Sequence, residues 1–182
     1  MNRYTAIQTA SGVFFDVVNP RPEDVRIDDI AASLAKQCRF TGHTSSFYSV
    51  AQHSVGVCDL LLEQGYSEAV QLWGLLHDAS EAYLVDLPTP IKRHTHLGEI
   101  YCTVEANVMS VICEKFGMCW YMPWPVKEAD LRLLSTEARD LMPDCSWCEE
   151  TPLPAKIEPW SSDAAESIFL LRFATLFGGA NV

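Results

Sequence analysis

A histidine and an aspartate, His77 and Asp78, stand side by side within the apolar run LLHDASEAYLV at residues 75–85. Two further carboxylates, Glu81 and Asp86, follow within the next eight residues. In a helix, residues three and four positions apart lie on one side, so His77, Asp78 and Glu81 would face the same neighbour. Because buried charge is costly, such groups normally have charged partners or hold a metal ion. The alternative is a solvated helix end with an ordinary hydrogen-bonded histidine.

Two other apolar stretches contain residues of the same kind. His53 lies in YSVAQHSVGV, and Asp130 lies at the edge of an apolar stripe in VKEADLRLL. A lone histidine on an apolar face is usually a hydrogen-bonded core residue. Together with His77 and Asp78, however, these residues form a mixed nitrogen and oxygen set that suits a catalytic ion such as Mn²⁺, Co²⁺, Fe²⁺ or Zn²⁺. Such an ion can make water a nucleophile near neutral pH.

Hydrophobic periodicity predicts about six helices that would carry these residues. Alternating apolar and polar residues before a proline-rich turn add a short strand or hairpin within 11–25. An irregular, packed connection is expected over 143–159. We therefore expect an all-α fold in a single domain over 1–182, with its core at about 28–141. The expected helices span about 28–38, 47–65, 67–85, 97–117, 123–142 and 162–177.

Composition limits the classes of partner. The 182 residues carry 13 basic and 24 acidic side chains, a net charge of −11, which argues against binding to duplex nucleic acid. The apolar stretches are shorter than the ~20 residues that cross a bilayer. No basic N-terminal segment leads into an apolar one, so we expect no membrane association and a cytoplasmic location, in a host cell if the protein is viral. Cys145 and Cys148 in CSWC lack a second cysteine pair for zinc, and we expect reduced thiols there.

Three blocks of the sequence resemble a known family. RFTGHTSSFYSVAQHSV, LLHDASEAYLVDLPTPIK and KEADLRLLSTEARDL are similar to successive blocks of the HD-domain metal-dependent phosphohydrolases. The similarity is to the subgroup related to the 5′-deoxynucleotidase YfbR, which includes compact bacteriophage enzymes that hydrolyse deoxynucleoside triphosphates. It covers about 28–141, and the third block is the least specific. The resemblance implies a compact HD-domain helical bundle.

The resemblance also implies roles for individual residues. His53, His77, Asp78 and Asp130 match the metal ligands of the family, and Glu81 matches the glutamate that orients or deprotonates the attacking water. The ion would be Co, Mn, Zn, Fe or Mg, and the number of ions is left open. A position one helical turn from the ligands suits Glu81 for that role independently.

Three residues match positions near the substrate, and a fourth is a candidate to bind phosphate. Asp86 matches an aspartate that assists catalysis or protonates the leaving oxygen, with a loop hydrogen bond as its alternative. Arg39 matches an arginine that contacts phosphate, and Phe40 stands where relatives carry an aromatic residue beside the sugar or base. Lys92 is a second candidate phosphate ligand, although a surface lysine is more often merely solvated.

The remaining polar residues of interest receive structural assignments. His43 could line a pocket, but a loop histidine with a structural hydrogen bond is favoured. His94 and His96 are expected in a loop rather than at a metal. Glu137, two turns after Asp130, is expected to form surface or interface salt bridges.

The resemblance implies hydrolysis of the 5′ phosphoester of a deoxynucleotide. The few cations of the chain favour a monophosphate, which would yield deoxynucleoside and inorganic phosphate. The compact length is instead similar to the viral enzymes, which would release triphosphate from a substrate such as dATP. A non-catalytic nucleotide-binding HD module and an iron-dependent HD oxygenase are alternatives from other classes. Relatives assemble as dimers or larger oligomers, so a homo-oligomer is expected.

Overall fold

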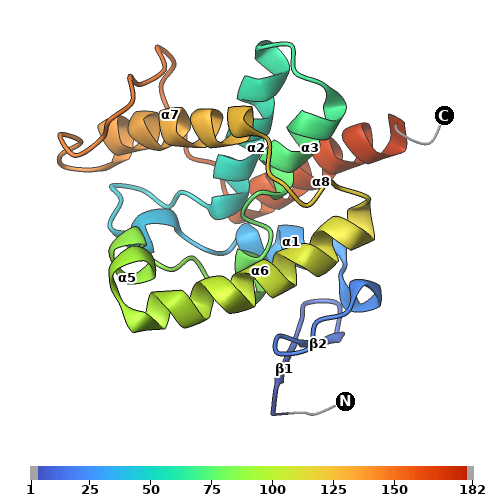
Figure 1. Cartoon of the computed structure of the whole chain (residues 1–182). Helices are drawn as coiled ribbons and strands as arrows, with labels where there is room; N and C mark the ends of the chain where they lie inside the picture. The colour runs from blue at the N-terminus through green and yellow to red at the C-terminus, as the bar shows by residue number, and fades with distance from the viewer. Residues whose placement is uncertain (1–3, 180–182) are drawn as a thin grey trace.

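Helices make up most of the structure, a computed structural model that describes residues 4–179 (Figure 1). The first three and last three residues of the predicted domain lie outside this range. The predicted helical fold with an N-terminal hairpin is confirmed, and Ile7 pairs with Phe15 across the two antiparallel strands. The elements are β1 (Ala6–Gln8), β2 (Phe14–Asp16), α1 (Ile27–Leu34), α2 (Val50–Glu63), α3 (Glu68–Leu76), α4 (Glu81–Leu84), α5 (Thr89–His94), α6 (His96–Phe116), α7 (Trp124–Leu141) and α8 (Ser162–Gly179), with 3-10 helices at Pro22–Asp24 and Arg39–Gly42.

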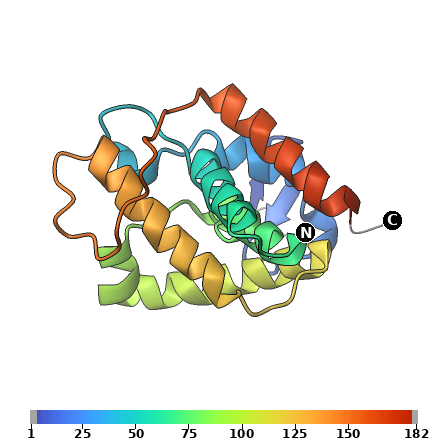
Figure 2. The same ribbon diagram turned by 90° about the horizontal axis from the view of Figure 1, so that it is seen from above.

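Helix α2 lies in the middle of the bundle, between α7 and α8 in the view of Figure 2. It begins after Ser49, whose hydroxyl caps the first turn. Two glycines allow close packing: a Cβ on Gly56 would lie 2.7 Å from Leu133 of α7, and a Cβ on Gly74 of α3 would lie 2.5 Å from Leu61. Small residues therefore bring together α2 and α7, which carry His53 and Asp130, and α3, whose end precedes His77 and Asp78.

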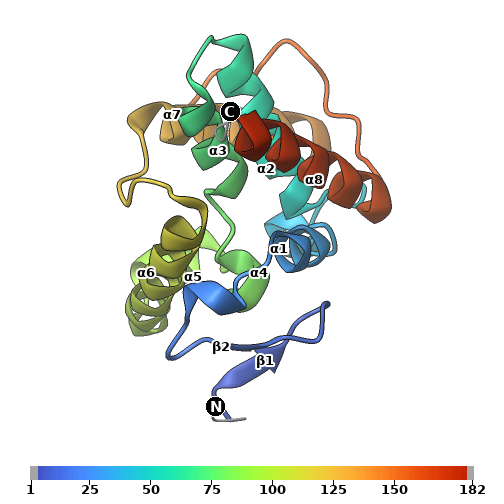
Figure 3. The ribbon, with the colours of Figure 1, turned by 90° about the vertical axis from the view of Figure 1, so that its right-hand side faces the viewer.

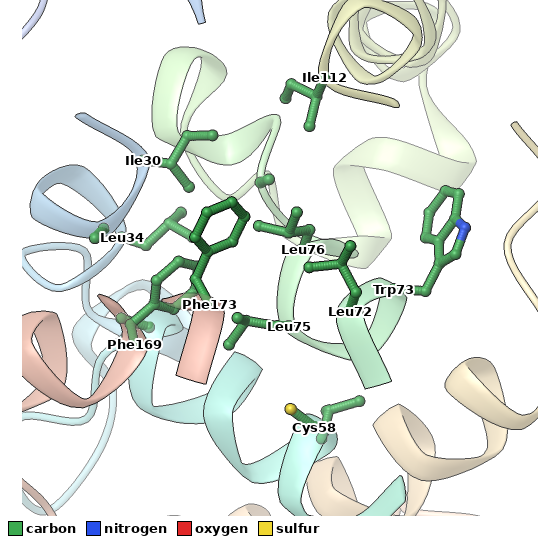
Figure 4. Close-up of a cluster of buried hydrophobic side chains, with 14 of the residues drawn as sticks. Ile30, Leu34, Cys58, Leu72, Trp73, Leu75, Leu76, Ile112, Phe169 and Phe173 are labelled. Carbon is green, nitrogen blue, oxygen red and sulfur yellow. The ribbon is translucent and has the colours of Figure 1, made fainter. Parts of the chain in front are cut away.

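One hydrophobic cluster extends from Phe15 of the hairpin to α8. Figure 4 shows the part of it that includes Leu75 and Leu76 of α3 and Phe169 and Phe173 of α8. Phe15 of β2 stacks on Tyr83 of α4 with ring centroids 3.9 Å apart, which attaches the hairpin below α1 and α4 (Figure 3). Phe173 of α8 packs edge-on against Phe116 of α6, with centroids 5.0 Å apart. Burying each such side chain contributes about 1.5–3 kcal/mol. This cluster holds in place the helix ends that carry the polar residues.

The predicted third helix over 67–85 is interrupted. Helix α3 ends at Leu76 and α4 begins at Glu81, and between them the backbone N–H groups of Ala79 and Glu81 donate to carbonyls three residues back. These tighter turns separate the two apolar segments, which look continuous in the sequence. Glu81 therefore lies on the short helix α4. The sequence predicted it on the same helix as His77, one turn further along.

Helix α5 forms where the sequence predicted only a proline-rich interruption. A proline in its first turn is compatible with a helix because the first N–H groups have no intrahelical partner. The chain then turns directly into α6, so closely that a Cβ on Gly98 would overlap the carbonyl group of Lys92. None of the helices in residues 4–179 is both long and apolar enough to span a bilayer.

The connection between α7 and α8 is irregular, as predicted. The side chain of Gln52 on α2 holds it by two hydrogen bonds of 2.8 Å: its amide donates to the carbonyl of Glu158, and its oxygen accepts from the N–H of Trp160. A side chain next to His53 thus fixes the path of this segment.

Candidate metal centre

His53 is fully buried on α2, and both nitrogens of its ring face carboxylates. Its Nδ1 atom lies 2.7 Å from Oε1 of Glu137, and its Nε2 atom lies 3.2 Å from Oδ1 of Asp130. The Nε2 atom makes no hydrogen bond of acceptable geometry despite that proximity. A carboxylate behind Nδ1 keeps a proton on that nitrogen, so the neutral ring directs the lone pair of Nε2 toward Asp130.

His77 follows the last turn of α3, and its ring is oriented by the backbone. Its Nδ1 atom lies 2.8 Å from the carbonyl oxygen of Gly74, and since a carbonyl can only accept, Nδ1 must carry the proton. The Nε2 atom is buried without a hydrogen-bond partner and lies 3.1 Å from Oδ2 of Asp78. The rings of His77 and His53 are adjacent, with centroids 5.3 Å apart.

These side chains fit a divalent cation. Ligand atoms of His53, His77 and Asp130 all lie within 4.8 Å of one another. Asp78, the fourth predicted ligand, lies beside this cluster, with Oδ2 3.9 Å from Nε2 of His53. Two buried imidazole nitrogens without partners, next to acidic oxygens, are costly unless a cation takes their lone pairs. His53, His77 and Asp130 could hold a metal ion, as predicted, and the role of Asp78 as a fourth ligand stays a prediction.

Attraction between imidazoles and carboxylates dominates the electrostatics of the cluster. Burial and the charge of Arg39 oppose protonation of His53, but Glu137 and Asp130 outweigh them and raise its pKa to about 9. Burial raises the pKa of Asp78, yet His77 and His53 hold it well below the usual range. Against burial, His53 and His77 also lower the pKa of Asp130. The carboxylates that favour a proton on His53 would also favour a divalent cation, so a metal ion would compete with that proton for the ring.

Glu81 and Asp86 lie beside Asp78. Glu81 is buried and its Oε2 atom has no hydrogen-bond partner. Burial, followed by repulsion from Asp78 and Asp86, raises the pKa of Glu81 well above its usual value. Burial also raises the pKa of Asp86, with Arg39 opposing the shift. The backbone N–H of Asp86 donates to the side-chain oxygen of Gln37 at 3.3 Å.

Arg39 and Glu137 form a buried ion pair behind the cluster. Nε of Arg39 donates to Oε2 of Glu137 at 3.0 Å, and Nη1 of Arg39 lies 3.7 Å from Oδ2 of Asp78. The prediction that Glu137 forms surface or interface salt bridges is wrong, because the residue is fully buried. Burial is tolerated since its charge is compensated by Arg39 and His53. Its position seven residues after Asp130, on the same face of α7, was the sequence signal for it.

Phe40 follows Arg39 and belongs to a small aromatic group. The guanidinium carbon of Arg39 lies 5.6 Å from the centroid of the Phe40 ring. The ring of Trp147, in the segment after α7, approaches Phe40 edge-on with centroids 6.4 Å apart. Phe40 and Thr41 both have left-handed backbone conformations, with φ of 54° and 51°. The structure therefore places Trp147 next to the predicted substrate-binding residues, a proximity that sequence spacing does not reveal.

Lys92 already has a carboxylate partner. Its Nζ atom lies 2.7 Å from Oε1 of Glu105 on α6 and 5.4 Å from the centroid of the Tyr101 ring. Burial lowers the pKa of Lys92, but Glu105 more than compensates and raises it overall. A phosphate group would have to compete with Glu105 for this amino group.

The other three histidines lie outside the cluster. His43 is exposed, and its backbone N–H donates to the carbonyl of Phe40 at 3.0 Å. His94 and His96 end α5 and begin α6, so the expectation of a loop is wrong because α5 was not foreseen. Both are exposed, and His96 contacts Glu99 at 3.2 Å. In a separate turn after α7, the two cysteines of CSWC are free thiols, as expected.

The chain is similar in sequence to two proteins that are described as uncharacterized. No family model matches the chain. It is 42% identical over 176 residues to the uncharacterized protein YfdR of Escherichia coli (strain K12), covering 93% of this chain and 94% of that protein. It is 37% identical over 123 residues to the uncharacterized protein RCAP_rcc00048 of Rhodobacter capsulatus, covering 65% of this chain and 62% of that protein. The chain therefore belongs to the same protein family as YfdR of Escherichia coli.

Proposed function

We propose that the protein is a divalent-metal-dependent phosphohydrolase that cleaves the 5′ phosphoester bond of deoxynucleotides. The observation that supports this most is the pair of buried Nε2 atoms, on His53 and His77, which lack hydrogen-bond partners beside Asp78 and Asp130. Such a set suits Mn²⁺, Co²⁺, Fe²⁺ or Zn²⁺. A divalent ion held there would stabilise the negative charge that builds up on the phosphoryl group.

The neighbouring side chains would perform the remaining steps. Arg39, fixed by Glu137, would direct its amino groups to a phosphate oxygen. Glu81, with one unpartnered carboxylate oxygen, would accept a proton from the attacking water. The water oxygen bonds to phosphorus, the P–O5′ bond breaks, and Asp86 in its protonated form would donate a proton to O5′.

The charges around the cluster favour a monophosphate substrate. Among residues 4–179, the cations Arg39, Lys92 and Lys127 lie close to it, and each has an acidic partner: Arg39 contacts Glu137, Lys92 contacts Glu105, and Lys127 contacts Asp130 at 2.7 Å. Two further phosphate groups would therefore meet little uncompensated positive charge. We propose a deoxynucleoside monophosphate as the substrate, with deoxynucleoside and inorganic phosphate as products.

A product assay tests the proposal. The protein would be incubated with deoxynucleoside monophosphates, deoxynucleoside triphosphates and ribonucleotides in the presence of Mn²⁺, Co²⁺, Zn²⁺ or Mg²⁺. We expect inorganic phosphate from monophosphates and no product from an Asp78→Ala variant. Release of intact triphosphate, for example from dATP, would identify a triphosphohydrolase instead. No turnover of any of these substrates would refute both activities.

A further inference from the structure

Glu137 contacts a candidate metal ligand, His53, with one carboxylate oxygen and a candidate phosphate ligand, Arg39, with the other. It is fully buried on α7, and each of its oxygens faces a different basic group. Oε1 lies 2.7 Å from Nδ1 of His53, and Oε2 accepts from Nε of Arg39 at 3.0 Å. The buried Tyr48 side chain also hydrogen-bonds to this carboxylate. A carboxylate with this many partners is fixed in position.

The contact with His53 determines which nitrogen can bind a metal ion. Because Oε1 accepts at Nδ1, the proton of the neutral ring stays there, and Nε2 presents its lone pair to Asp130 and His77. Without an acceptor at this place, the buried ring would lose both its preferred tautomer and one point of attachment. Groups that hold a ligating histidine in this way typically change metal affinity by about 10–100-fold when they are removed.

The contact with Arg39 fixes the guanidinium in the same way. The bond from Nε to Oε2 uses the inner edge of the group and leaves Nη1 beside Asp78, 3.7 Å from its Oδ2 atom. A flexible arginine would lose side-chain entropy when it ordered around a phosphate group, whereas this one is already ordered. The position of Arg39 relative to the cluster thus depends on the same carboxylate as the orientation of His53.

We infer that Glu137 is a positioning residue that orients His53 for metal binding and Arg39 for phosphate binding through its two oxygens. The part that concerns Arg39 rests on the proposed function, whereas the part that concerns His53 requires only that the cluster binds a metal ion. The two parts can therefore be tested separately.

The first test compares metal affinity in two glutamine variants of the same helix. Glu137→Gln keeps the shape of the side chain, but its amide can accept from only one of the two donors. The charged Arg39 guanidinium forms the stronger bond to the amide oxygen, so the amide N–H turns toward Nδ1 of His53. Glu128→Gln removes an exposed charge from α7 and serves as the control. Titration calorimetry with Mn²⁺ should show affinity at least about 10-fold weaker for Glu137→Gln, and within twofold of wild type for Glu128→Gln. A folded Glu137→Gln protein with wild-type affinity would overturn the inference.

A second pair of variants keeps the test decisive if Glu137→Gln fails to fold. Arg39→Met/Glu137→Gln and Arg39→Met/Glu137→Leu both lack the guanidinium that would otherwise be buried without a partner. Only the first retains an oxygen that can accept from Nδ1 of His53. We expect it to bind Mn²⁺ at least about 10-fold more tightly than the leucine variant. Equal affinities would refute the proposed role toward His53. If Glu137 acted only on the stability of the fold, metal affinity would not depend on whether residue 137 can accept a hydrogen bond from Nδ1.

The Arg39 part is tested with inorganic phosphate at saturating Mn²⁺. Glu137→Gln and Arg39→Met should both weaken phosphate binding relative to wild type, and Glu128→Gln should not. Unchanged phosphate affinity in Glu137→Gln would overturn this part. If wild type bound no Mn²⁺, both the proposed function and the inference would be wrong. If wild type bound Mn²⁺ and hydrolysed no nucleotide, only the proposed function would fail, since the Mn²⁺ comparison requires no turnover.

Discussion

Replacing Asp130 with asparagine should abolish the stabilisation that a bound metal ion gives the protein. Asp130 contributes Oδ1 at 3.2 Å from Nε2 of His53, and asparagine preserves the shape of the side chain while removing its charge. An ion present at 100 times its Kd stabilises the folded state by about 2.7 kcal/mol. For a domain of this size, 1 kcal/mol shifts Tm by roughly 2–4 °C, so Mn²⁺ should raise the wild-type Tm by roughly 5–10 °C.

The variant should lose nearly all of this shift. If Asp130→Asn weakens the affinity for Mn²⁺ by about 100-fold, the same concentration equals the new Kd and stabilises by only about 0.4 kcal/mol. The corresponding Tm shift is roughly 1 °C. Absolute Tm is a poor measure, because Asp130 also contacts Lys127 at 2.7 Å and the metal-free variant loses that ion pair. The quantity to compare is the difference in Tm between samples with Mn²⁺ and samples with EDTA.

The assay is differential scanning fluorimetry of wild type, Asp130→Asn and Glu128→Gln with EDTA or Mn²⁺. Glu128 lies two residues from Asp130 on α7 and is exposed, so its glutamine variant controls for the loss of one negative charge. It should retain the wild-type shift. An Asp130→Asn protein with the full Mn²⁺ shift would show that this carboxylate is no metal ligand.

Two further changes have distinct expected effects. Glu81→Gln should lower hydrolysis by at least about 100-fold, because the amide cannot accept the proton, while Mn²⁺ affinity measured by calorimetry stays within severalfold of wild type; retained hydrolysis would remove Glu81 from the mechanism. Gly98→Ala places a Cβ against the backbone carbonyl of Lys92, which cannot yield as a side chain would, so chemical denaturation should show a loss of about 1–3 kcal/mol. A neutral Gly98→Ala change would mean that α5 can move away from α6 at little cost.

The helical periodicity of the sequence was sufficient to predict most of the fold. Helices α2, α6 and α7 appear close to their expected ends because each has a continuous apolar face. The long helix α6, for example, ends at Gly117, where a left-handed φ of 65° favours glycine. The interruption after Leu76 was not predictable in this way, because the apolar pattern continues across it and only backbone hydrogen bonds reveal the change.

The residues of the candidate cluster were predictable from the sequence, but the residues that contact and orient them were not. Histidine and aspartate on apolar faces stand out in a sequence, and His53, His77 and Asp130 do come together. Glu137 was misassigned because glutamate is rarely buried, and only contacts with two basic groups from distant segments make its burial tolerable. Lys92 was expected to face phosphate, and its pairing with Glu105 depends on how α5 turns back onto α6.

The two left-handed residues after Arg39 lower the stability of the segment that carries this arginine. Phe40 and Thr41 adopt a backbone conformation that costs non-glycine residues about 1–3 kcal/mol each. Such a cost persists only where the surrounding contacts impose it, and here they include the Arg39 guanidinium above the Phe40 ring. Substitutions that remove this strain should raise the stability of the protein. They should also make the segment that carries Arg39 less rigid. Gains in stability at these positions should therefore be accompanied by losses in the hydrolysis that we propose.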